Sequence, residues 1–417
     1  MTVLIAGAGI AGLTTALSLH QIGVDCRVFE ASDAIAPLGV GINTLPHAVR
    51  ELFDLGLKDA LAATAIPTAR LAYYSARGQE IWSEPRGEAA GYRWPQFSIH
   101  RGALQMVLLN AVRERLGSDR VLTGHRLTGW DETLAGVTAH FENRRTGEKH
   151  ASATGSLLIG ADGIHSAVRA QAYPNEGAPK WNGAILWRGV TQGHGFLDGR
   201  TMIMAGHETQ KFVAYPISRE TPLVNWIAER KFATDHVWRR EDWNRPGDLA
   251  DFLPWFESWR WDWLDVPAMV RAGGSCLEYP MVDRDPVERW TFGRVTLLGD
   301  AAHAMYPIGS NGASQAILDA RVLAREILAR GTTPDALLAY EAERRPATAR
   351  IVLANRGNGP EQVMQLVQQR APNGFARIAD VLTEDEREGI AAGYKQIAGF
   401  DRDVLNARPP IVPVPSQ

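Results

Sequence analysis

Short, mainly apolar runs recur in both halves of the chain, and each is followed by a glycine or an acidic residue. This pattern is typical of the carboxyl ends of buried parallel strands. The runs are residues 3–6, 25–29, 156–159 and 295–298. Helical periodicity covers residues 13–22, 101–116 and 313–330, and a further helix is expected from about Pro46. The order of strand, helix and strand at the start predicts a βαβ unit and a parallel α/β sheet.

The apolar pattern changes in the middle of the chain, from residue 181 to about residue 276. Strand-like segments rich in Val, Ile, Trp and Tyr are separated there by turn residues. They are residues 183–190, 201–205, 211–217 and 223–228. Further strands are expected at residues 71–75, 80–83, 121–130 and 137–142. The pattern predicts a mainly antiparallel sheet inserted into the α/β domain.

Composition and charge exclude several classes of protein. The 417 residues are 45% hydrophobic, enough for a large core shared between two domains, and the formal net charge is −3. With no basic or acidic block, we expect no nucleic-acid partner and no membrane partner. The two cysteines argue against a disulfide framework or a cysteine metal site. Neither a signal-peptide pattern nor an apolar stretch of about 18 residues is present, so a cytoplasmic location is expected.

The first glycine-rich turn carries a dinucleotide-binding pattern. Gly7, Gly9 and Gly12 fit G-x-G-x-x-G between a predicted strand and a predicted helix. Such glycines allow a tight turn, close approach of a pyrophosphate and close packing of the helix on the strand. Glu30 ends the second strand, where an acid binds ribose hydroxyls. The predicted contacts are Gly7, Gly9, Ile10, Ala11, Gly12 and Glu30. Alone, this motif fits NAD and FAD equally, or a turn without any ligand.

The Gly299-Asp300 motif distinguishes FAD from NAD as the expected cofactor. It follows the strand at 295–298 and places a carboxylate where it can bind a polyol, such as the ribityl chain of a flavin. The following loop and helix N-terminus can stabilise negative charge on the flavin pyrimidine ring. The predicted contacts are Gly299, Asp300, Pro307, Gly309 and Gly312. The alternative is a turn in which Asp300 caps a helix, but the coupling with the first motif favours FAD.

A third signature runs from residue 160 to residue 169. Asp162-Gly163 ends the strand at 156–159 and caps a predicted turn into a helix, on which Arg169 lies. All three residues are predicted to contribute to the cofactor site. A capped helix with a surface arginine is the alternative interpretation.

The three motifs together resemble those of the class A flavoprotein aromatic hydroxylases, the superfamily of para-hydroxybenzoate and salicylate hydroxylases. The resemblance covers roughly residues 3–355. It implies that the first motif binds the ADP part of FAD, that Asp162-Gly163 serves both FAD and the nicotinamide coenzyme, and that Asp300 binds the ribityl chain. It also implies that Arg101 lies against FAD with Gln105 nearby.

Within this family, the strings PLGVGIN, WRGVT, YPMVDRDP and LLGDAAH resemble those of phenazine hydroxylases. Gly41 and Ile42 of the first string are expected to approach the flavin ring. Three segments depart from this pattern. The loop that commonly reads Pro-x-x-Gly-Gln-Gly has Asn311 before Gly312, so its flavin contacts are expected from Asn311 and the backbone. The tryptophan-rich residues 255–263 do not closely match the phenazine hydroxylases, and the tail after Asn355 also diverges, which leaves the substrate's identity open.

The resemblance implies an FAD-dependent monooxygenase. NADH or NADPH, bound transiently because there is no second Rossmann motif, would reduce FAD. The reduced flavin would trap O2 as a C4a-hydroperoxide that hydroxylates an aromatic or N-heteroaromatic ring, such as a phenazine carboxylate, with or without loss of the carboxyl group. No catalytic side chain beyond the flavin and no metal is expected. The protein is expected to be a monomer or a homodimer that binds a small aromatic substrate.

Several residues are predicted to contact this substrate. They are Trp187, Arg188, Tyr215, Trp226, Pro307 and Ile308. The first four lie on predicted strands, where alternate residues share a face, so only some of them can line a pocket. Arg188 could bind a carboxylate bidentately or form an internal ion pair. Tyr215 could polarise a substrate hydroxyl or lie in the core.

Three other functions fit parts of the pattern. A flavin-dependent halogenase shares the FAD motifs, and residues 258–263 weakly resemble its tryptophan motif without its glycine. An NAD-linked dehydrogenase fits the first motif but not Gly299-Asp300. A flavin-binding sensor would hold FAD without aromatic-stimulated oxidation of NAD(P)H.

The predicted fold class is α/β, with three parts. A Rossmann-like FAD-binding domain comprises residues 1–70, 98–175 and 277–355. An inserted, mainly antiparallel β-sheet domain for the substrate comprises residues 71–97 and 176–276. A C-terminal helical segment and tail comprise residues 356–417.

Overall fold

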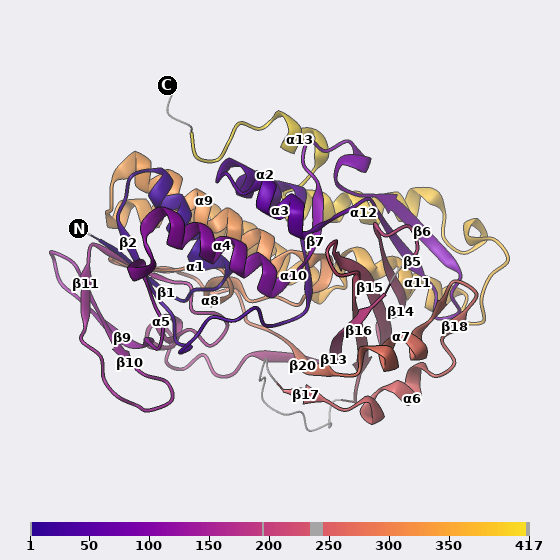
Figure 1. Cartoon of the computed structure of the whole chain (residues 1–417). Helices are drawn as coiled ribbons and strands as arrows, with labels where there is room; N and C mark the ends of the chain where they lie inside the picture. The colour runs from indigo at the N-terminus through magenta and orange to yellow at the C-terminus, as the bar shows by residue number, and fades with distance from the viewer. Residues whose placement is uncertain (1, 194–195, 234–244, 414–417) are drawn as a thin grey trace.

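The computed structural model describes residues 2–193, 196–233 and 245–413. Residues 194–195 and 234–244 of the predicted sheet domain, and the last four residues of the predicted tail, lie outside the described residues. A parallel sheet with its helices lies beside a larger antiparallel sheet, and C-terminal helices extend along both (Figure 1). The predicted α/β fold class is confirmed.

The short apolar runs of the sequence form a six-stranded sheet in the order β21-β22-β12-β1-β2-β8. Its strands are β1 (Val3–Ala6), β2 (Cys26–Phe29), β8 (Val121–Leu122), β12 (Leu157–Gly160), β21 (Thr291–Phe292) and β22 (Val295–Leu297). All neighbours are parallel except β21 and β22. Because parallel sheets are covered on both faces, nearly every residue of the central strands is buried and apolar.

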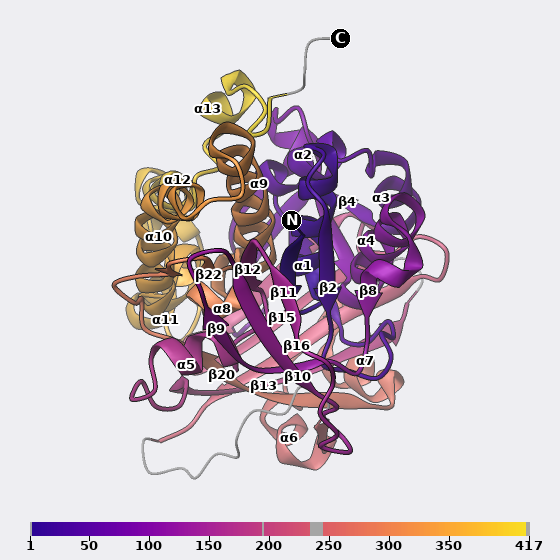
Figure 2. The same ribbon diagram turned by 90° about the vertical axis from the view of Figure 1, so that its left-hand side faces the viewer.

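Helices cover one face of this sheet, and a small antiparallel sheet lies against the other (Figure 2). The helices are α1 (Ile10–Gln21), α4 (Arg101–Leu116), α9 (Gly312–Arg330) and α10 (Pro334–Arg356). The small sheet contains β9 (Arg126–Glu132), β10 (Val137–Glu142) and β11 (Ala153–Gly155). The single strand predicted at 121–130 is therefore wrong. Gly124, with φ of +71°, turns the chain there, and β8 and β9 belong to different sheets.

The inserted sheet has eight strands in the order β17-β20-β13-β16-β15-β14-β5-β6. They are β5 (Arg70–Tyr74), β6 (Glu80–Pro85), β13 (Lys180–Gln192), β14 (Thr201–His207), β15 (Gln210–Ser218), β16 (Leu223–Lys231), β17 (Pro246–Gly247) and β20 (Cys276–Asp283). Only β14 and β5 pair in parallel, so the mainly antiparallel sheet is confirmed. Since β20 pairs with β13, the sheet continues to Asp283, past the predicted boundary at residue 276.

The two faces of the eight-stranded sheet pack against different elements. One face, called the tryptophan face here, packs Trp187 and Trp226 against α6 (Leu253–Phe256) and α7 (Val266–Gly273). The opposite face, called the tyrosine face, carries Tyr73 and Tyr215 and packs against α11 (Gln362–Arg370). Residues alternate between the faces because strand side chains point to opposite sides in turn.

A third sheet joins the two main sheets. Its order is β3-β7-β4, and its strands are β3 (Gly41–Thr44), β7 (Gln96–His100) and β4 (Ile66–Thr68). Helices α2 (Pro46–Asp54) and α3 (Lys58–Thr64) lie between β3 and β4 in the chain. The glycine-rich string PLGVGIN, residues 37–43, therefore ends in strand β3. Its Gly and Asn have low strand propensity, and pairing with β7 overrides that propensity.

Two further helices, α12 (Glu384–Ala398) and α13 (Arg402–Ala407), complete the C-terminal segment. A capping box starts α12, in which the Thr383 side chain accepts the Glu386 N–H and the Glu386 side chain accepts the Thr383 N–H. Among the residues that the structure describes, no helix is long and apolar enough to cross a membrane.

Candidate active site

Four strand ends bring the predicted cofactor residues to one edge of the parallel sheet. Gly7 follows β1, Glu30 follows β2, Asp162 follows β12, and Asp300 begins the short helix α8 (Asp300–His303) after β22. Parallel pairing of these strands places their carboxyl ends side by side. In open α/β sheets, ligands bind outside this edge.

The three glycines of the first turn have different surroundings. A Cβ on Gly7 would lie 2.3 Å from the carbonyl oxygen of Ala161, and a Cβ on Gly12 would lie 2.0 Å from that of Gly7. Backbone packing therefore requires glycine at both positions. At Gly9 no atom of the described residues lies within 4 Å of an added Cβ, and none of their side chains caps the start of α1. The open space and free N–H groups fit a pyrophosphate, and Ile10 and Ala11 begin the helix there.

The acid after β2 is held beside this turn. The Glu30 carboxylate accepts the N–H of Ala8 at 2.9 Å and the N–H of Ser32 at 2.8 Å. Gln105 donates from Nε2 to the Ala8 carbonyl at 2.8 Å, so this side chain braces the turn. Arg101, at the start of α4, is exposed and free to lie against a ligand.

Asp162 has one oxygen without a partner. Its Oδ2 accepts the N–H groups of Ala167 at 2.7 Å and Val168 at 3.4 Å, while its buried Oδ1 has no partner among the described residues. Burial raises the pKa of Asp162, although hydrogen bonds from Ser166 and the backbone oppose this shift. A buried unsatisfied acceptor is costly, so the site fits a ligand that donates a hydrogen bond here. Gly163, with φ of +79°, completes the turn.

The structure corrects the prediction that Arg169 contacts the cofactor. Arg169 lies on α5 (Ala167–Ala172) and is fully buried. Its guanidinium donates to the carbonyls of Ala301 at 3.0 Å and Ala302 at 2.8 Å, and it pairs with Glu176. Arg169 therefore links α5 to α8 by hydrogen bonds. It positions Asp300 indirectly, because Asp300 is the first residue of α8.

A buried ion network holds the Gly299-Asp300 turn. Gly299, with φ of +64°, donates its N–H to Asp319 Oδ2 at 3.1 Å. Asp319 also binds His303, and Arg344 Nε donates to its Oδ1 at 2.7 Å. Burial would raise the pKa of Asp319, but His303 and Arg344 hold it below its ordinary value. The Asp300 carboxylate stays exposed at the sheet edge, where a ribityl chain can reach it.

The predicted flavin loop at Gly41 docks on the tyrosine face. Its N–H donates to Asn225 Oδ1 at 2.7 Å, and its carbonyl accepts Arg188 Nη2 at 2.7 Å. The Arg188 side chain therefore contacts the backbone of the predicted flavin loop. Tyr215 shares this face, and burial raises its pKa to about 12. Ile42, the next residue of β3, is partly buried.

The loop before α9 uses most of its side chains internally. Pro307 is exposed, whereas Ile308 is buried in a cluster with Leu186 and Met281. Asn311 donates from Nδ2 to the Tyr394 hydroxyl at 2.9 Å. The Asn311 side chain is thus committed within the protein, so the predicted side-chain contact to flavin is wrong, and a contact from the backbone stays a prediction. The other predicted loop contacts are Gly309, with φ of +67°, and Gly312, the first residue of α9.

The structure also corrects the predicted substrate contacts of two tryptophans. Trp187 stacks on Phe252 with ring centroids 4.9 Å apart, and Trp226 donates from Nε1 to Thr191 Oγ1 at 3.0 Å. Both lie on the tryptophan face, opposite Tyr215 and the Gly41 loop. The tryptophans that suggested a halogenase pack in this same cluster.

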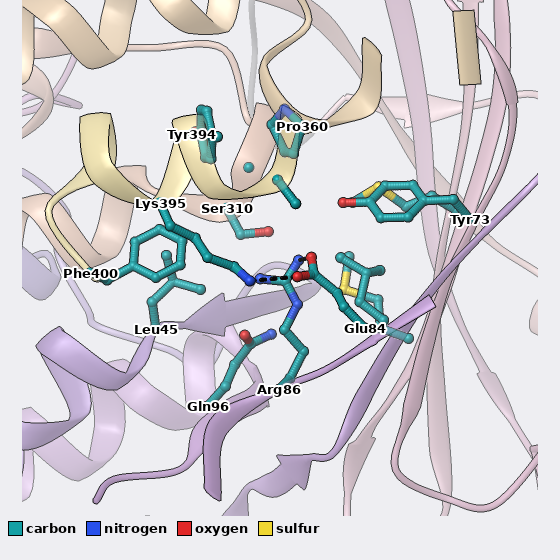
Figure 3. A pocket seen from close by; sticks show the side chains of 15 residues that line it. Leu45, Tyr73, Glu84, Arg86, Gln96, Ser310, Pro360, Tyr394, Lys395 and Phe400 are labelled. Carbon is teal, nitrogen blue, oxygen red and sulfur yellow. Dashed lines mark hydrogen bonds and ion pairs between the residues drawn. The ribbon is translucent and has the colours of Figure 1, made fainter. Parts of the chain in front are cut away.

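A small cavity lies between the tyrosine face and the loop before α9 (Figure 3). The sheet contributes Leu71, Tyr73, Met202 and Met204, and the loop contributes Gly309 and Ser310. Its volume of about 20 Å³ holds about one water molecule. None of the six predicted substrate residues lines it. Ile308 lines a second, polar cavity of about 60 Å³ beside Lys211 and Arg356.

The sequence analysis missed the other half of this cavity wall. Glu84, Arg86, Tyr394, Lys395 and Phe400 contribute their side chains to it. Alternation along the predicted strand 201–205 could have placed residues 202 and 204 on one face. No local signal marks Lys395, because it comes from α12, more than 300 residues beyond β6 in the chain.

The chain is similar to known flavoproteins along most of its length. The family described as FAD binding domain matches residues 1–189 and 280–355. The phenazine 1,6-dicarboxylic acid hydroxylase PhzS of Lysobacter antibioticus is 49% identical over 361 residues, which cover 85% of this chain and 89% of that protein. The 3-amino-4-hydroxybenzoate 2-monooxygenase of Streptomyces cremeus is 34% identical over 83% of this chain and 84% of that protein.

A solved structure shares the whole architecture. Klebsiella pneumoniae HpxO complexed with FAD and uric acid superposes with a TM-score of 0.74 at 25% identity. The superposition covers 98% of this chain and 97% of that one. The similarity therefore includes the C-terminal helices as well as the two sheets.

Proposed function

We propose that this chain, which belongs to the class A flavin-dependent aromatic hydroxylases of the FAD-binding-domain family, acts on a phenazine-type substrate. The proposed substrate is a planar N-heteroaromatic carboxylic acid, which the enzyme hydroxylates. The enzyme is an FAD-dependent monooxygenase that uses NAD(P)H. The observation that carries the substrate proposal is the cavity at the loop before α9, which is apolar on one side and charged at one end. We expect the protein to work in the cytoplasm, as a monomer or a homodimer.

FAD, when bound, supplies the oxygen chemistry that amino-acid side chains lack. The residues of the chain would bind the FAD and orient the substrate ring. The start of α1 at Gly9 would hold the pyrophosphate, Glu30 would bind the ribose and Asp300 would bind the ribityl chain. The N-terminus of α9 at Gly312 would stabilise negative charge on a reduced flavin.

The sheet and the C-terminal helices enclose the cavity between them. Met202 and Met204 line it from β14, and Tyr394 and Phe400 close it from the C-terminal segment. Enclosure by these side chains would keep water away from the bound substrate ring. No side chain is needed as a nucleophile, and the oriented ring is the group that reacts.

Stimulation of NAD(P)H oxidation by candidate substrates tests this function. FAD-loaded protein is mixed with NADH or NADPH and a panel of phenazine, quinoline, pyridine and benzoate carboxylates. We expect phenazine carboxylates to give the largest acceleration, with a hydroxylated product. Product mass then distinguishes retention of the carboxyl group from its loss. Absence of acceleration by every compound would contradict the proposal, and bound FAD without acceleration would indicate a sensor.

A further inference from the structure

Arg86 and Lys395 both enter the small cavity and bind the same carboxylate. Lys395 Nζ lies 2.6 Å from Glu84 Oε2, and Arg86 pairs with Glu84 Oε1 (Figure 3). Resting on the function proposed above, we propose that Arg86 and Lys395 form the anchor for the carboxylate of the substrate.

The anchor contains one more cation than anion. The side chains of Arg86 and Glu84 are only 10% and 5% exposed, and that of Lys395 is 27% exposed. Burial would raise the pKa of Glu84, but Arg86 and Lys395 hold it below its ordinary value, so Glu84 stays ionised. One carboxylate cannot neutralise two cations. A buried excess charge is costly, and an anionic ligand removes that cost.

The neighbouring buried carboxylates are engaged elsewhere. Glu229 and Glu361 both pair with Lys211. Within the described ranges, Glu84 is the only carboxylate paired with Arg86 or Lys395. These two carboxylates share one lysine, but neither of them pairs with Arg86 or Lys395, so a ligand anion can take the place beside the two cations.

Two buried hydrogen-bond donors lie at the cavity. In the part of the chain that the structure describes, the Tyr73 hydroxyl interacts with the Arg86 guanidinium, and neither this hydroxyl nor Arg86 Nε donates a hydrogen bond to an acceptor of another residue. Both residues line the cavity, and Tyr73 is only 1% exposed. Because unpaired buried donors are rare and costly, their presence in one cavity indicates a ligand that accepts hydrogen bonds. A carboxylate has enough lone pairs for both.

The rest of the cavity suits a flat apolar ring. Leu71, Met202 and Met204 line it on the sheet side, and Phe400 lines it on the side of the C-terminal segment. Methionine is unbranched and makes favourable contacts between its sulfur and aromatic rings. Since the cavity of about 20 Å³ is far smaller than a tricyclic ring, these flexible side chains must move aside on binding. The lysine at the charged end can move in the same way.

The anchor is assembled from two separate parts of the chain. Arg86 follows β6 within the residues that match the family, whereas Lys395 lies on α12, beyond residue 355 where that match ends. Arg188, the carboxylate binder expected from the sequence, donates to the Gly41 carbonyl instead. The C-terminal segment therefore contributes directly to the choice of substrate.

A pair of ligands of equal shape tests the anchor. Phenazine-1-carboxylate and phenazine-1-carboxamide are titrated into FAD-loaded protein, and each Kd is read from the change in flavin absorbance. We expect the wild type to prefer the carboxylate. Lys395→Met and Arg86→Gln should each weaken carboxylate binding by about tenfold or more and change amide binding little, because charge-assisted hydrogen bonds are lost. The amide Kd divided by the carboxylate Kd reports charge recognition, and this ratio is insensitive to a general loss of packing.

Two further variants complete the test. Arg387→Gln removes one positive charge from the same helix, where Arg387 donates to the Ile81 carbonyl outside the cavity, and should keep the wild-type ratio. Should Arg86→Gln not fold, Glu84→Gln/Arg86→Gln removes the pair together and should also lower the ratio. A folded, FAD-loaded Lys395→Met protein with the wild-type ratio would overturn the anchor alone. A wild type that binds neither ligand and is accelerated by no aromatic acid would overturn the proposed function as well.

Discussion

Single residues at the edge of the parallel sheet differ in what their surroundings require. Gly7 and Gly12 are glycines because backbone oxygens fill the space that a Cβ would need. Gly9 has φ of −74° and ψ of −176°, which any residue can adopt, and its surroundings are open. The protein alone gives no reason for glycine at this position, whereas a bound pyrophosphate does.

Alanine substitutions separate these two kinds of glycine. Gly12→Ala forces a Cβ against a backbone oxygen and should lower the free energy of unfolding by about 1–3 kcal/mol. Gly9→Ala should leave the melting temperature of the apoprotein nearly unchanged but weaken FAD binding by about tenfold, because the methyl group occupies the space of the phosphates. Thermal unfolding and FAD titration measure the two effects. Wild-type FAD affinity in Gly9→Ala would argue against a pyrophosphate at this turn.

Asp300 is exposed at the sheet edge, and its role can be tested in the same way. Asp300→Ala should lose most of its FAD on purification, since hydrogen bonds to a charged group contribute about 1.5–3 kcal/mol. The measurement is the ratio of flavin to protein from the absorbance spectrum. Asp335→Ala, at an exposed position in the first turn of α10, is the matched control and should keep its FAD. Full flavin occupancy in the Asp300 variant would refute the ribityl contact.

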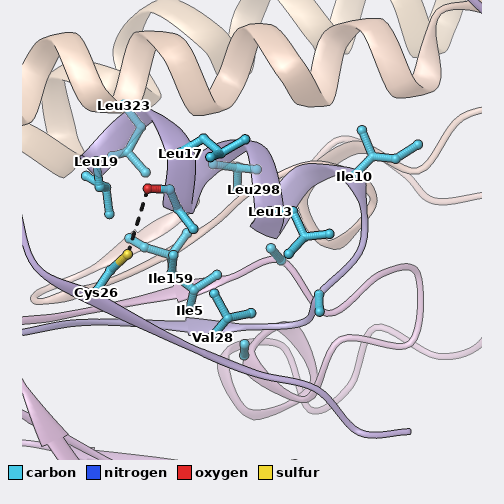
Figure 4. Packing of buried hydrophobic residues seen from close by; sticks show 14 of the residues in the cluster. Ile5, Ile10, Leu13, Leu17, Leu19, Cys26, Val28, Ile159, Leu298 and Leu323 are labelled. Atoms are coloured by element: carbon cyan, nitrogen blue, oxygen red, sulfur yellow. Dashed lines mark hydrogen bonds between the residues drawn. The ribbon is translucent and has the colours of Figure 1, made fainter. Parts of the chain in front are cut away.

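At the scale of elements, buried connections fix the helices that present the site. Helix α1 packs on both sides, with Leu13 near the strands and Leu17 and Leu19 near α9 (Figure 4). Arg169 fastens α5 to α8. Asp319 on α9 binds both the Gly299 turn and Arg344 of α10. Hydrogen bonds and packing between these helices therefore hold the edge of the parallel sheet that carries the predicted cofactor residues.

Asp319→Asn tests this network through its dependence on pH. The folded-state pKa of Asp319 lies below its unfolded value near 3.8, so the carboxylate stabilises the fold above that value and the contribution is lost as pH falls through the folded pKa. At neutral pH the variant should be less stable by about 3–5 kcal/mol, because His303 and Arg344 lose their partner. The gap should shrink as the pH falls below about 4. Urea unfolding at a series of pH values measures it, and a gap independent of pH would contradict the network.

At the scale of the whole molecule, the sequence predicted the parallel sheet, the inserted sheet and the cofactor edge. These features are encoded locally, in apolar runs and in glycines and acids at strand ends. The substrate cavity is not encoded in this way. Trp187 and Tyr215 lie on two predicted strands of similar composition, and only the register with β16, which pairs with both strands, shows that they face opposite sides.

The anchor was also beyond reach of the sequence for a physical reason. Glu84 and Lys395 are separated by more than 300 residues, and their meeting depends on how the C-terminal segment folds back over the sheet. A lysine on an amphipathic helix is most often solvated, so nothing at residue 395 distinguishes it. Likewise, Arg169 and Asn311 looked like cofactor contacts, and only the structure shows their donors committed to the protein.

The source of the oxygen atom in the product tests the central claim most directly. Purified protein with FAD and NAD(P)H is incubated with a phenazine carboxylate under isotopically labelled molecular oxygen in ordinary water. We expect one labelled oxygen atom in the product, because a flavin-dependent monooxygenase inserts one atom of O2 and releases the other as water. A product that takes its oxygen from water, or NAD(P)H oxidation that leaves the aromatic acid unchanged, would contradict the account.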